Sequence, residues 1–277
     1  MAGKNTMKNL ASNAAIALAL LLGACCQSPS TASDDGSGLS AGTIVPVTPD
    51  SKELFEMDAF KTQSGKTVQF YAVKHASIHI ECDGKTFEID PVAKLGERTT
   101  DYSAFPKADH ILVTHEHADH FDKDAIALLT AEKTTLVTNA RCAGMLGYGQ
   151  VMANGDTVRL FDGCTVEAVP AYNITEGHLQ FHPKGRDNGY ILTVDGLRIY
   201  IAGDTEDIPE MAQIKDIDIA FLPCNQPYTM TAGQLANAAK IIRPKVLFPY
   251  HYSRTDVSTL PEQLKNDGIE VRIRHYE

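Results

Sequence analysis

The chain has 277 residues, and its 25 Lys and Arg against 35 Asp and Glu give a formal net charge of −10. An acidic balance of this kind excludes nucleic-acid binding through a generally basic surface. Hydrophobic residues make up 43% of the chain and charged residues 22%, which is typical of a packed globular protein and excludes a disordered one. No apolar run reaches the about 20 residues that a membrane-spanning helix needs.

The amino-terminal residues are typical of an export signal. Lys4 and Lys8 precede a short apolar stretch, and a basic start followed by such a stretch marks a secretory signal peptide. The stretch ends in Leu22-Gly23-Ala24-Cys25, which resembles the lipobox of bacterial lipoproteins. The resemblance implies that residues 1–24 are removed as a lipoprotein-type signal peptide and that lipid on Cys25 anchors the chain to a membrane. A plain signal peptide is the alternative.

Residues 25–42 are rich in Ser, Thr, Asp and Gly and contain little that could be buried. This composition predicts a flexible tether in front of one folded domain at 43–277. We therefore expect an exported protein of the bacterial cell envelope or periplasm. The remaining cysteines form no CxxC pair and identify no disulfide, so Cys82, Cys142 and Cys164 are expected to be small buried residues.

The folded part begins with strands. Alternation of apolar and polar residues predicts strands at 68–73 and 77–82, and Asp83-Gly84 before the run at 85–89 predicts a hairpin. Farther along, short apolar runs alternate with helix-like stretches, one of which Thr231 could cap. The later strands are predicted at 111–113, 135–137, 191–194, 197–202, 217–222 and 246–248, and the helices at 122–129, 140–146, 231–242 and 259–264. This order predicts an α/β fold in which helices cover sheets.

One loop concentrates the residues that can do chemistry. It reads Thr114-His115-Glu116-His117-Ala118-Asp119-His120 and directly follows the predicted strand at 111–113. In a tight loop, its three histidines and its aspartate can converge on one place. Imidazole and carboxylate ligands favour zinc, manganese or iron over calcium. Two pairs of ligands on so short a loop indicate two metal ions.

Further ligands are expected at the ends of other strands, where α/β folds keep their sites. Asp204 and His251 each come directly after an apolar strand. A third candidate is His182 or its neighbour His178. The residue pattern by itself leaves these two histidines open.

The whole set resembles the metallo-β-lactamase superfamily. The similar features, in chain order, are His115-x-His117-x-Asp119-His120, a later His, Gly203-Asp204-Thr205 and His251. A closer similarity, through stretches such as Phe181-His182-Pro183-Lys184-Gly185, is to the branch that contains ascorbate-6-phosphate lactonase. The resemblance implies an αββα four-layer sandwich with a metal pair at one edge between the two sheets.

The family pattern, carried over residue by residue, implies two ligand sets. One metal ion would be held by His115, His117 and His182, the other by Asp119, His120 and His251, and Asp204 would bridge them. The ions are expected to be Zn²⁺, with Mn²⁺ or Fe²⁺ as alternatives.

Two neighbouring residues have roles that depend on the same resemblance. The match around Pro183 favours His182 over His178 as the ligand. Asp90 resembles a buried aspartate that orients a ligand histidine, although an aspartate that begins a turn before Pro91 is the alternative. No role follows from the sequence for His75.

The charge of such a site indicates hydrolysis. Two divalent cations, two aspartates, neutral histidines and a bridging hydroxide leave about +1 before a substrate binds, and the hydroxide would attack a carbonyl or phosphoryl centre. Asp119 and Asp204 are the expected catalytic residues. We expect a small anionic substrate, namely an ester, a lactone or a phosphodiester. The alternatives are β-lactamase-type amide hydrolysis, which a bridging Asp204 disfavours, and a non-catalytic metal-binding envelope lipoprotein.

Overall fold

The computed structural model describes residues 55–276. The predicted signal peptide, the lipid attachment at Cys25 and the tether at 25–42 lie outside the described residues. In the part of the chain that is described, none of the helices combines the length and the apolar character needed to cross a bilayer.

The first sheet has seven strands in the order β1-β2-β3-β4-β7-β8-β9. Neighbouring strands from β1 to β4 are antiparallel, and those from β4 to β9 are parallel. The strands are β1 (Met57–Lys61), β2 (Thr67–Lys74), β3 (Ser77–Cys82), β4 (Lys85–Ile89), β7 (His110–Leu112), β8 (Thr135–Thr138) and β9 (Gln150–Val151). A separate two-stranded ribbon pairs β5 (Lys94–Leu95) with β6 (Arg98–Thr99).

The second sheet has seven strands in the order β10-β11-β12-β13-β14-β15-β16. Its first three pairings are antiparallel and its last three are parallel, as in the first sheet. The strands are β10 (Thr157–Phe161), β11 (Cys164–Ala171), β12 (Asp187–Val194), β13 (Leu197–Ile201), β14 (Ile219–Pro223), β15 (Val246–Tyr250) and β16 (Glu270–Val271).

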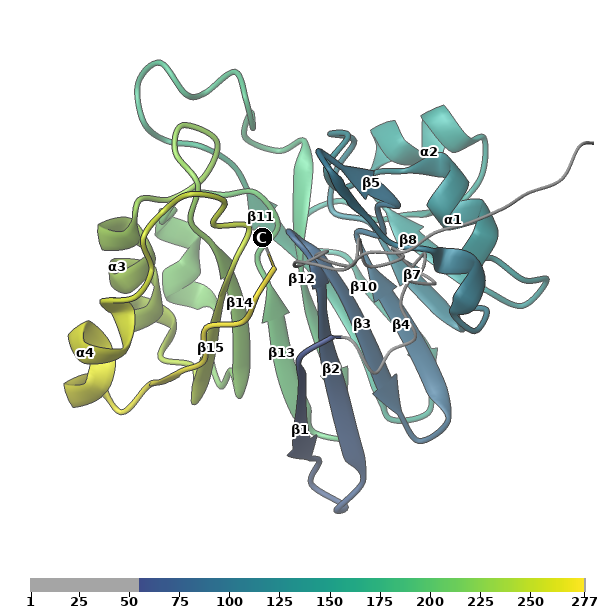
Figure 1. The fold of residues 1–277 in the computed structure, drawn as a ribbon, viewed down its shortest axis with the longest axis horizontal. Helices are drawn as coiled ribbons and strands as arrows, with labels where there is room; N and C mark the ends of the chain where they lie inside the picture. Colours follow the sequence, from purple (N-terminus) through teal and green to yellow (C-terminus); the bar gives the residue numbers. More distant parts are fainter. Residues whose placement is uncertain (1–54, 277) are drawn as a thin grey trace, which may run out of the picture. The chain divides into compact units, whose positions relative to one another are not determined.

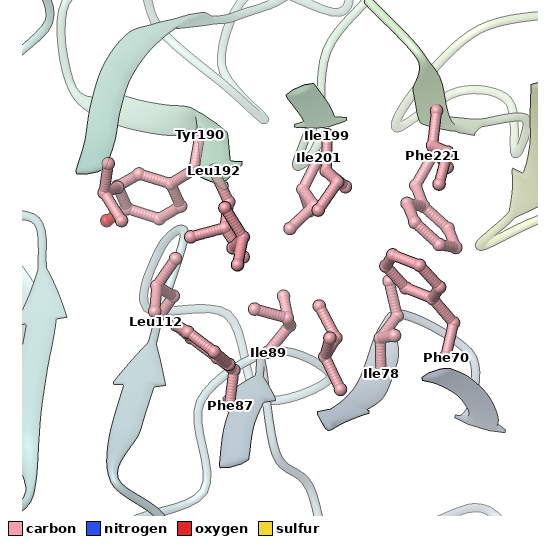
Figure 2. Packing of buried hydrophobic residues seen from close by; sticks show 14 of the residues in the cluster. Phe70, Ile78, Phe87, Ile89, Leu112, Tyr190, Leu192, Ile199, Ile201 and Phe221 are labelled. Atoms are coloured by element: carbon pink, nitrogen blue, oxygen red, sulfur yellow. The ribbon is translucent and has the colours of Figure 1, made fainter. Parts of the chain in front are cut away.

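The main core lies between the two sheets. Alternate side chains of the strands of each sheet point toward the other sheet, as Figure 2 shows for Phe70 and Ile78 facing Phe221 and Ile201. The rings of Phe70 and Phe221 meet across this layer with their centroids 5.7 Å apart. Burying aliphatic and aromatic side chains of this size contributes about 1.5–3 kcal/mol each, so this layer is the principal source of stability.

Helices cover the outer face of each sheet (Figure 1). The helices α1 (Lys123–Leu129) and α2 (Ala140–Leu146) pack on the first sheet, and α3 (Ala232–Ile242) and α4 (Leu260–Leu264) pack on the second. Short 3₁₀ turns lie at Tyr102–Ala104, Pro209–Gln213 and Lys265–Asp267. The four layers confirm the αββα sandwich that the resemblance implied.

Local signals explain where the helices begin. Asp122 and Asn139 accept hydrogen bonds from backbone N–H groups in the first turns of α1 and α2. Thr231 and Gln234 form a reciprocal capping box at α3, so the predicted cap is confirmed.

The predicted strands and helices are present, and their ends lie within two residues of the prediction except at β12, which begins at Asp187 rather than at 191. The strands β1, β5, β6, β9, β10, β11 and β16 were not predicted. The strand β1 is largely exposed and lacks a clear apolar alternation, whereas β10 alternates at Val158 and Leu160 but has no fully buried residue. The strand β11 does alternate, but Pro170 interrupts its pattern. Cys82, Cys142 and Cys164 are buried and free, as expected, and Cys224 is as well.

Two glycines let the ends of β12 and β13 approach each other closely. A Cβ on Gly189 would lie 2.7 Å from the backbone oxygen of Ala202, and one on Gly203 would lie 2.9 Å from the backbone oxygen of Asn188. Gly203 also has φ +63°, which a side chain would disfavour. This close approach sets the position of Asp204, the residue that follows.

Candidate metal centre

Four segments bring the seven predicted ligands to one edge of the sandwich. They are the loop after β7, the loop before β12, the segment after β13 and the residue after β15. Potential ligand atoms gather in two groups, and within each group they all lie within 4.8 Å of one another. The groups are His115, His117, His182 and Asp204, called here the first group, and His75, Asp119, His120 and His251, the second group.

Asp204 lies between the two groups. Its Oδ2 atom is 3.2 Å from Nε2 of His182 and 3.8 Å from Nε2 of His115. Its Oδ1 atom is 3.1 Å from Nε2 of His120 and 3.4 Å from Nε2 of His251. A carboxylate that turns one oxygen toward each group has the geometry of a ligand shared by two cations.

The atoms that converge here lack ordinary partners. Asp204 is only 2% exposed, and His120, His182 and His251 are fully buried or nearly so. Among the described residues, the Nε2 atoms of these three histidines and Oδ1 of Asp204 find no hydrogen bond of good geometry. An unsatisfied buried polar atom costs about 1–3 kcal/mol. Nitrogen and carboxylate oxygen are the donors that zinc, manganese and iron accept, so the residues present fit a pair of such cations.

Other residues hold the Nδ1 side of two of the predicted ligand histidines, His120 and His182. Oδ2 of Asp90 lies 2.8 Å from Nδ1 of His120, and Asp90 also accepts hydrogen bonds from the backbone N–H and the hydroxyl of Thr114. Oδ2 of Asp187 lies 3.0 Å from Nδ1 of His182. With Nδ1 donating to a carboxylate, Nε2 is left free to bind a cation.

Ion pairs fix the loop after β7 to its surroundings. Glu116 lies 3.1 Å from Arg141 at the start of α2 and 3.6 Å from Arg186. Arg186 in turn donates two hydrogen bonds of 2.7 Å to Asp187. The same guanidinium therefore connects the histidine-rich loop with the carboxylate that holds His182.

The charges around Asp204 favour its ionised form. Burial would raise the pKa of Asp204, but the charges of His120 and His251 hold this pKa well below its usual range. Burial disfavours the charged form of His182, yet Asp187 and Asp204 raise its pKa to about 9. Protons held by ligand histidines must leave when a cation binds, so cation binding is expected to weaken as the pH falls.

The sequence left the choice between His178 and His182 open until the family pattern was applied. The structure places His182 beside Asp204 and places Nδ1 of His178 3.3 Å from Glu206 instead. The buried carboxylate of Glu206 also accepts the backbone N–H groups of Ile174 and Thr175. His178 therefore belongs to the packing of this loop rather than to the two groups.

Two residues have roles in the site that the sequence did not assign. His75, at the turn between β2 and β3, has its Nε2 atom 3.3 Å from Oδ2 of Asp119. Asp187, at the first position of β12, holds His182. Burial would raise the pKa of Asp119, but His120, His251 and His75 hold it well below its usual range. Asp119 is thus an ionised carboxylate surrounded by imidazoles.

Known proteins resemble this chain in sequence. A family model described as the β-lactamase superfamily domain matches residues 69–251. A UPF0173 metal-dependent hydrolase from Geobacillus thermodenitrificans is 34% identical over 190 residues, and the match covers 65% of this chain and 83% of the relative.

Solved structures also resemble the chain. A protein from Parabacteroides distasonis, provisionally named a metal-dependent hydrolase, is 52% identical with a TM-score of 0.78, and the match covers 80% of this chain and all of the other. The metallo hydrolase Igni18 from Ignicoccus hospitalis is 28% identical with a TM-score of 0.63, over 74% of this chain and 94% of its own.

Proposed function

The chain belongs to the metallo-β-lactamase superfamily of metal-dependent hydrolases, and from this premise we propose that it uses two divalent cations to hydrolyse a small anionic ester, lactone or phosphodiester. The observation that carries the proposal is the position of Asp204, whose two carboxylate oxygens face the two groups of histidines separately. Zn²⁺ is the proposed metal, with Mn²⁺ or Fe²⁺ as alternatives.

Each cation has its own proposed ligands. His115, His117 and His182 would hold the first cation, Asp119, His120 and His251 would hold the second, and Asp204 would touch both. Two divalent cations bring +4 and the two aspartates −2, so the centre would carry about +2 before water or substrate arrives. A positive centre in an otherwise acidic protein supports an anionic substrate.

Asp204 and Asp119 have different proposed roles because their side chains differ in exposure. Bound cations would supply hydroxide near neutral pH and stabilise negative charge that develops on a substrate oxygen. Asp204 is buried and can act only as a fixed ligand, whereas the side chain of Asp119 is 32% exposed. Asp119 is therefore the proposed residue that would take the proton released when water becomes hydroxide and pass it to the leaving group. His120 is held from its far side by Asp90, which keeps its Nε2 aimed at the centre.

A narrower proposal concerns the branch of the superfamily. The stretch Phe181-His182-Pro183-Lys184-Gly185 is similar to the branch that contains ascorbate-6-phosphate lactonase. Lys184 lies at the exposed end of this stretch, where it pairs with Glu210 at 2.6 Å. We therefore propose a phosphorylated or carboxylated lactone as the first substrate to test.

The sequence before the described residues supports a location. We propose that the chain is exported to the bacterial cell envelope and anchored by lipid on Cys25, because Lys4, Lys8 and the apolar stretch precede Leu22-Gly23-Ala24-Cys25. Fractionation of cells that express the wild type and Cys25→Ser tests this. The wild type should sediment with membranes and the variant should not; equal distribution of the two would refute the anchor.

Metal content and turnover of paired variants test the proposed function. The purified wild type should hold two cations per chain and hydrolyse members of a panel of lactones and phosphodiesters. His182→Ala should lose turnover and one cation. His178→Ala, on the same loop, should keep its turnover and two bound cations. Full turnover by His182→Ala would refute the ligand set, and bound metal without turnover on any substrate, β-lactams included, would favour a non-catalytic role.

A further inference from the structure

His75 is a buried histidine that the proposed ligand sets do not use. It occupies the turn between β2 and β3, far in sequence from the histidine-rich loop, and is only 5% exposed. Its Nε2 atom lies 3.3 Å from Oδ2 of Asp119. Its ring lies over the ring of His251, with the centroids 3.8 Å apart and the planes inclined by 42°. It therefore contacts two members of the second group at once.

The backbone of His75 is held as firmly as its ring. Its N–H donates a hydrogen bond of 2.6 Å to the carbonyl of Tyr276, and its carbonyl accepts one of 3.0 Å from the N–H of His251. His75 has φ +51° and His251 has φ +48°. Residues with side chains rarely adopt this left-handed conformation, and they keep it only where the surroundings enforce it. Both histidines are thus fixed by one continuous set of contacts that ends at the carboxyl-terminal segment.

Asp119 is the member of the second group that most needs such support. Its side chain is 32% exposed, whereas the side chains of His120 and His251 are buried. Oδ2 of Asp119 is 3.4 Å from Nε2 of His251 and 4.0 Å from Nε2 of His120. An ionised carboxylate only accepts hydrogen bonds, so the Nε2–H of His75 is the donor. That hydrogen bond restricts rotation of the carboxylate toward solvent.

We propose that His75 is a positioning residue that sets Asp119 and His251 for the second cation. The proposal rests on the two-cation function above and goes beyond it, because it assigns the second group a support of its own. Asp90 supports His120 through Nδ1, and His75 supplies the corresponding support to Asp119. Loss of a residue that orients a metal ligand lowers metal affinity about 10- to 100-fold. This loss should fall on the second cation alone.

Stepwise titration of the full-length metal-free protein with Zn²⁺ tests the proposal. The wild type should bind two cations. His75→Ala should bind the first with unchanged affinity and the second about 10- to 100-fold more weakly. His75→Gln, whose amide N–H can still donate to Asp119, should recover part of this loss. His275→Gln alters a histidine whose side chain is 89% exposed and serves as the control.

The outcomes separate failure of the inference from failure of the proposed function. A wild type that binds fewer than two cations would overturn the two-cation function itself. Two cations in the wild type with an unchanged second affinity in His75→Ala, or with both affinities lowered equally, would overturn the role of His75 alone. X-ray absorption of the Zn²⁺-saturated proteins gives a further readout: if His75→Ala has one nitrogen ligand fewer than the wild type, His75 is a direct ligand and the positioning role is wrong.

Discussion

The two sheets have the same plan but contribute differently to the centre. Each has three antiparallel pairings followed by three parallel ones, and each places its loops at the same edge. The first sheet supplies one crowded loop after its fifth strand, β7. The second supplies single residues from three segments, namely His182 before its third strand, Asp204 after its fourth and His251 after its sixth. The centre therefore forms only when both sheets are packed together.

The different contributions of the two sheets are clearest in the segments that follow the fourth strand of each sheet. Asp90 follows β4 and Asp204 follows β13, and both reach His120. Asp90 lies 2.8 Å from its Nδ1 atom, and Asp204 lies 3.1 Å from its Nε2 atom. One carboxylate thus holds the ring, and the other faces the side of the ring where a cation would bind. Equivalent positions in the two sheets have become a support and a proposed ligand.

Of the two aspartates Asp90 and Asp204, which contact His120, removing Asp204, the proposed ligand, should have the largest effect on metal binding. Asp204→Ala takes away the carboxylate that faces both groups, so both cations should bind more than about 100-fold more weakly, beyond the range seen for loss of a supporting residue. Turnover should fall to background. Equilibrium dialysis and assays with added metal measure both effects. Retention of two tightly bound cations would show that Asp204 is not shared.

Changing Asp90, which supports His120, should have a smaller effect that is limited to one cation. Asp90→Asn suits the φ of +43° at this position, because Asn tolerates left-handed backbone, but it removes the charge that faces His120. The second cation should bind about 10- to 100-fold more weakly, while the first is little changed. The same stepwise Zn²⁺ titration measures both affinities. An equal loss at both cations would mean that Asp90 acts on the whole loop through Thr114.

The smallest effect should come from the contact that brings the ends of β12 and β13 together. Gly189→Ala would place a Cβ 2.7 Å from the backbone oxygen of Ala202, so we expect a loss of about 1–3 kcal/mol in the free energy of unfolding. Gly144→Ala, in α2 with open space around it, should instead be neutral or stabilise by up to about 1 kcal/mol. Urea unfolding of the metal-free proteins compares the two. Equal stabilities would show that the strand ends can separate without cost.

Much of this arrangement could be predicted from the sequence, because metal ligands follow short apolar strands and such strands are visible locally. The loop at 115–120 and the residues Asp204 and His251 fall into this class. Their gathering at one edge was expected from the family pattern, and the distances between them come from the structure. Their roles as ligands stay predictions until metal binding is measured.

The supporting residues His75 and Asp187 were harder to predict than the proposed ligands, for a physical reason. His75 reaches Asp119 only because a turn between two antiparallel strands ends beside the loop after a parallel strand. No residue near His75 in the sequence indicates that this turn and this loop come together. Asp187 was missed because its partner His182 lies across a loop whose shape the residues do not reveal. The edge strand β1 was missed because it is largely exposed and does not alternate, and β10 was missed because its alternation extends over only Val158 and Leu160.

The carbonyl of Tyr276 accepts hydrogen bonds from the N–H of His75 and from Arg98. This contact affects where a purification tag can be placed. A polyhistidine tag placed close after Tyr276 would bring foreign imidazoles near the second group, where they could compete for added zinc and distort any titration. An untagged protein avoids that artefact.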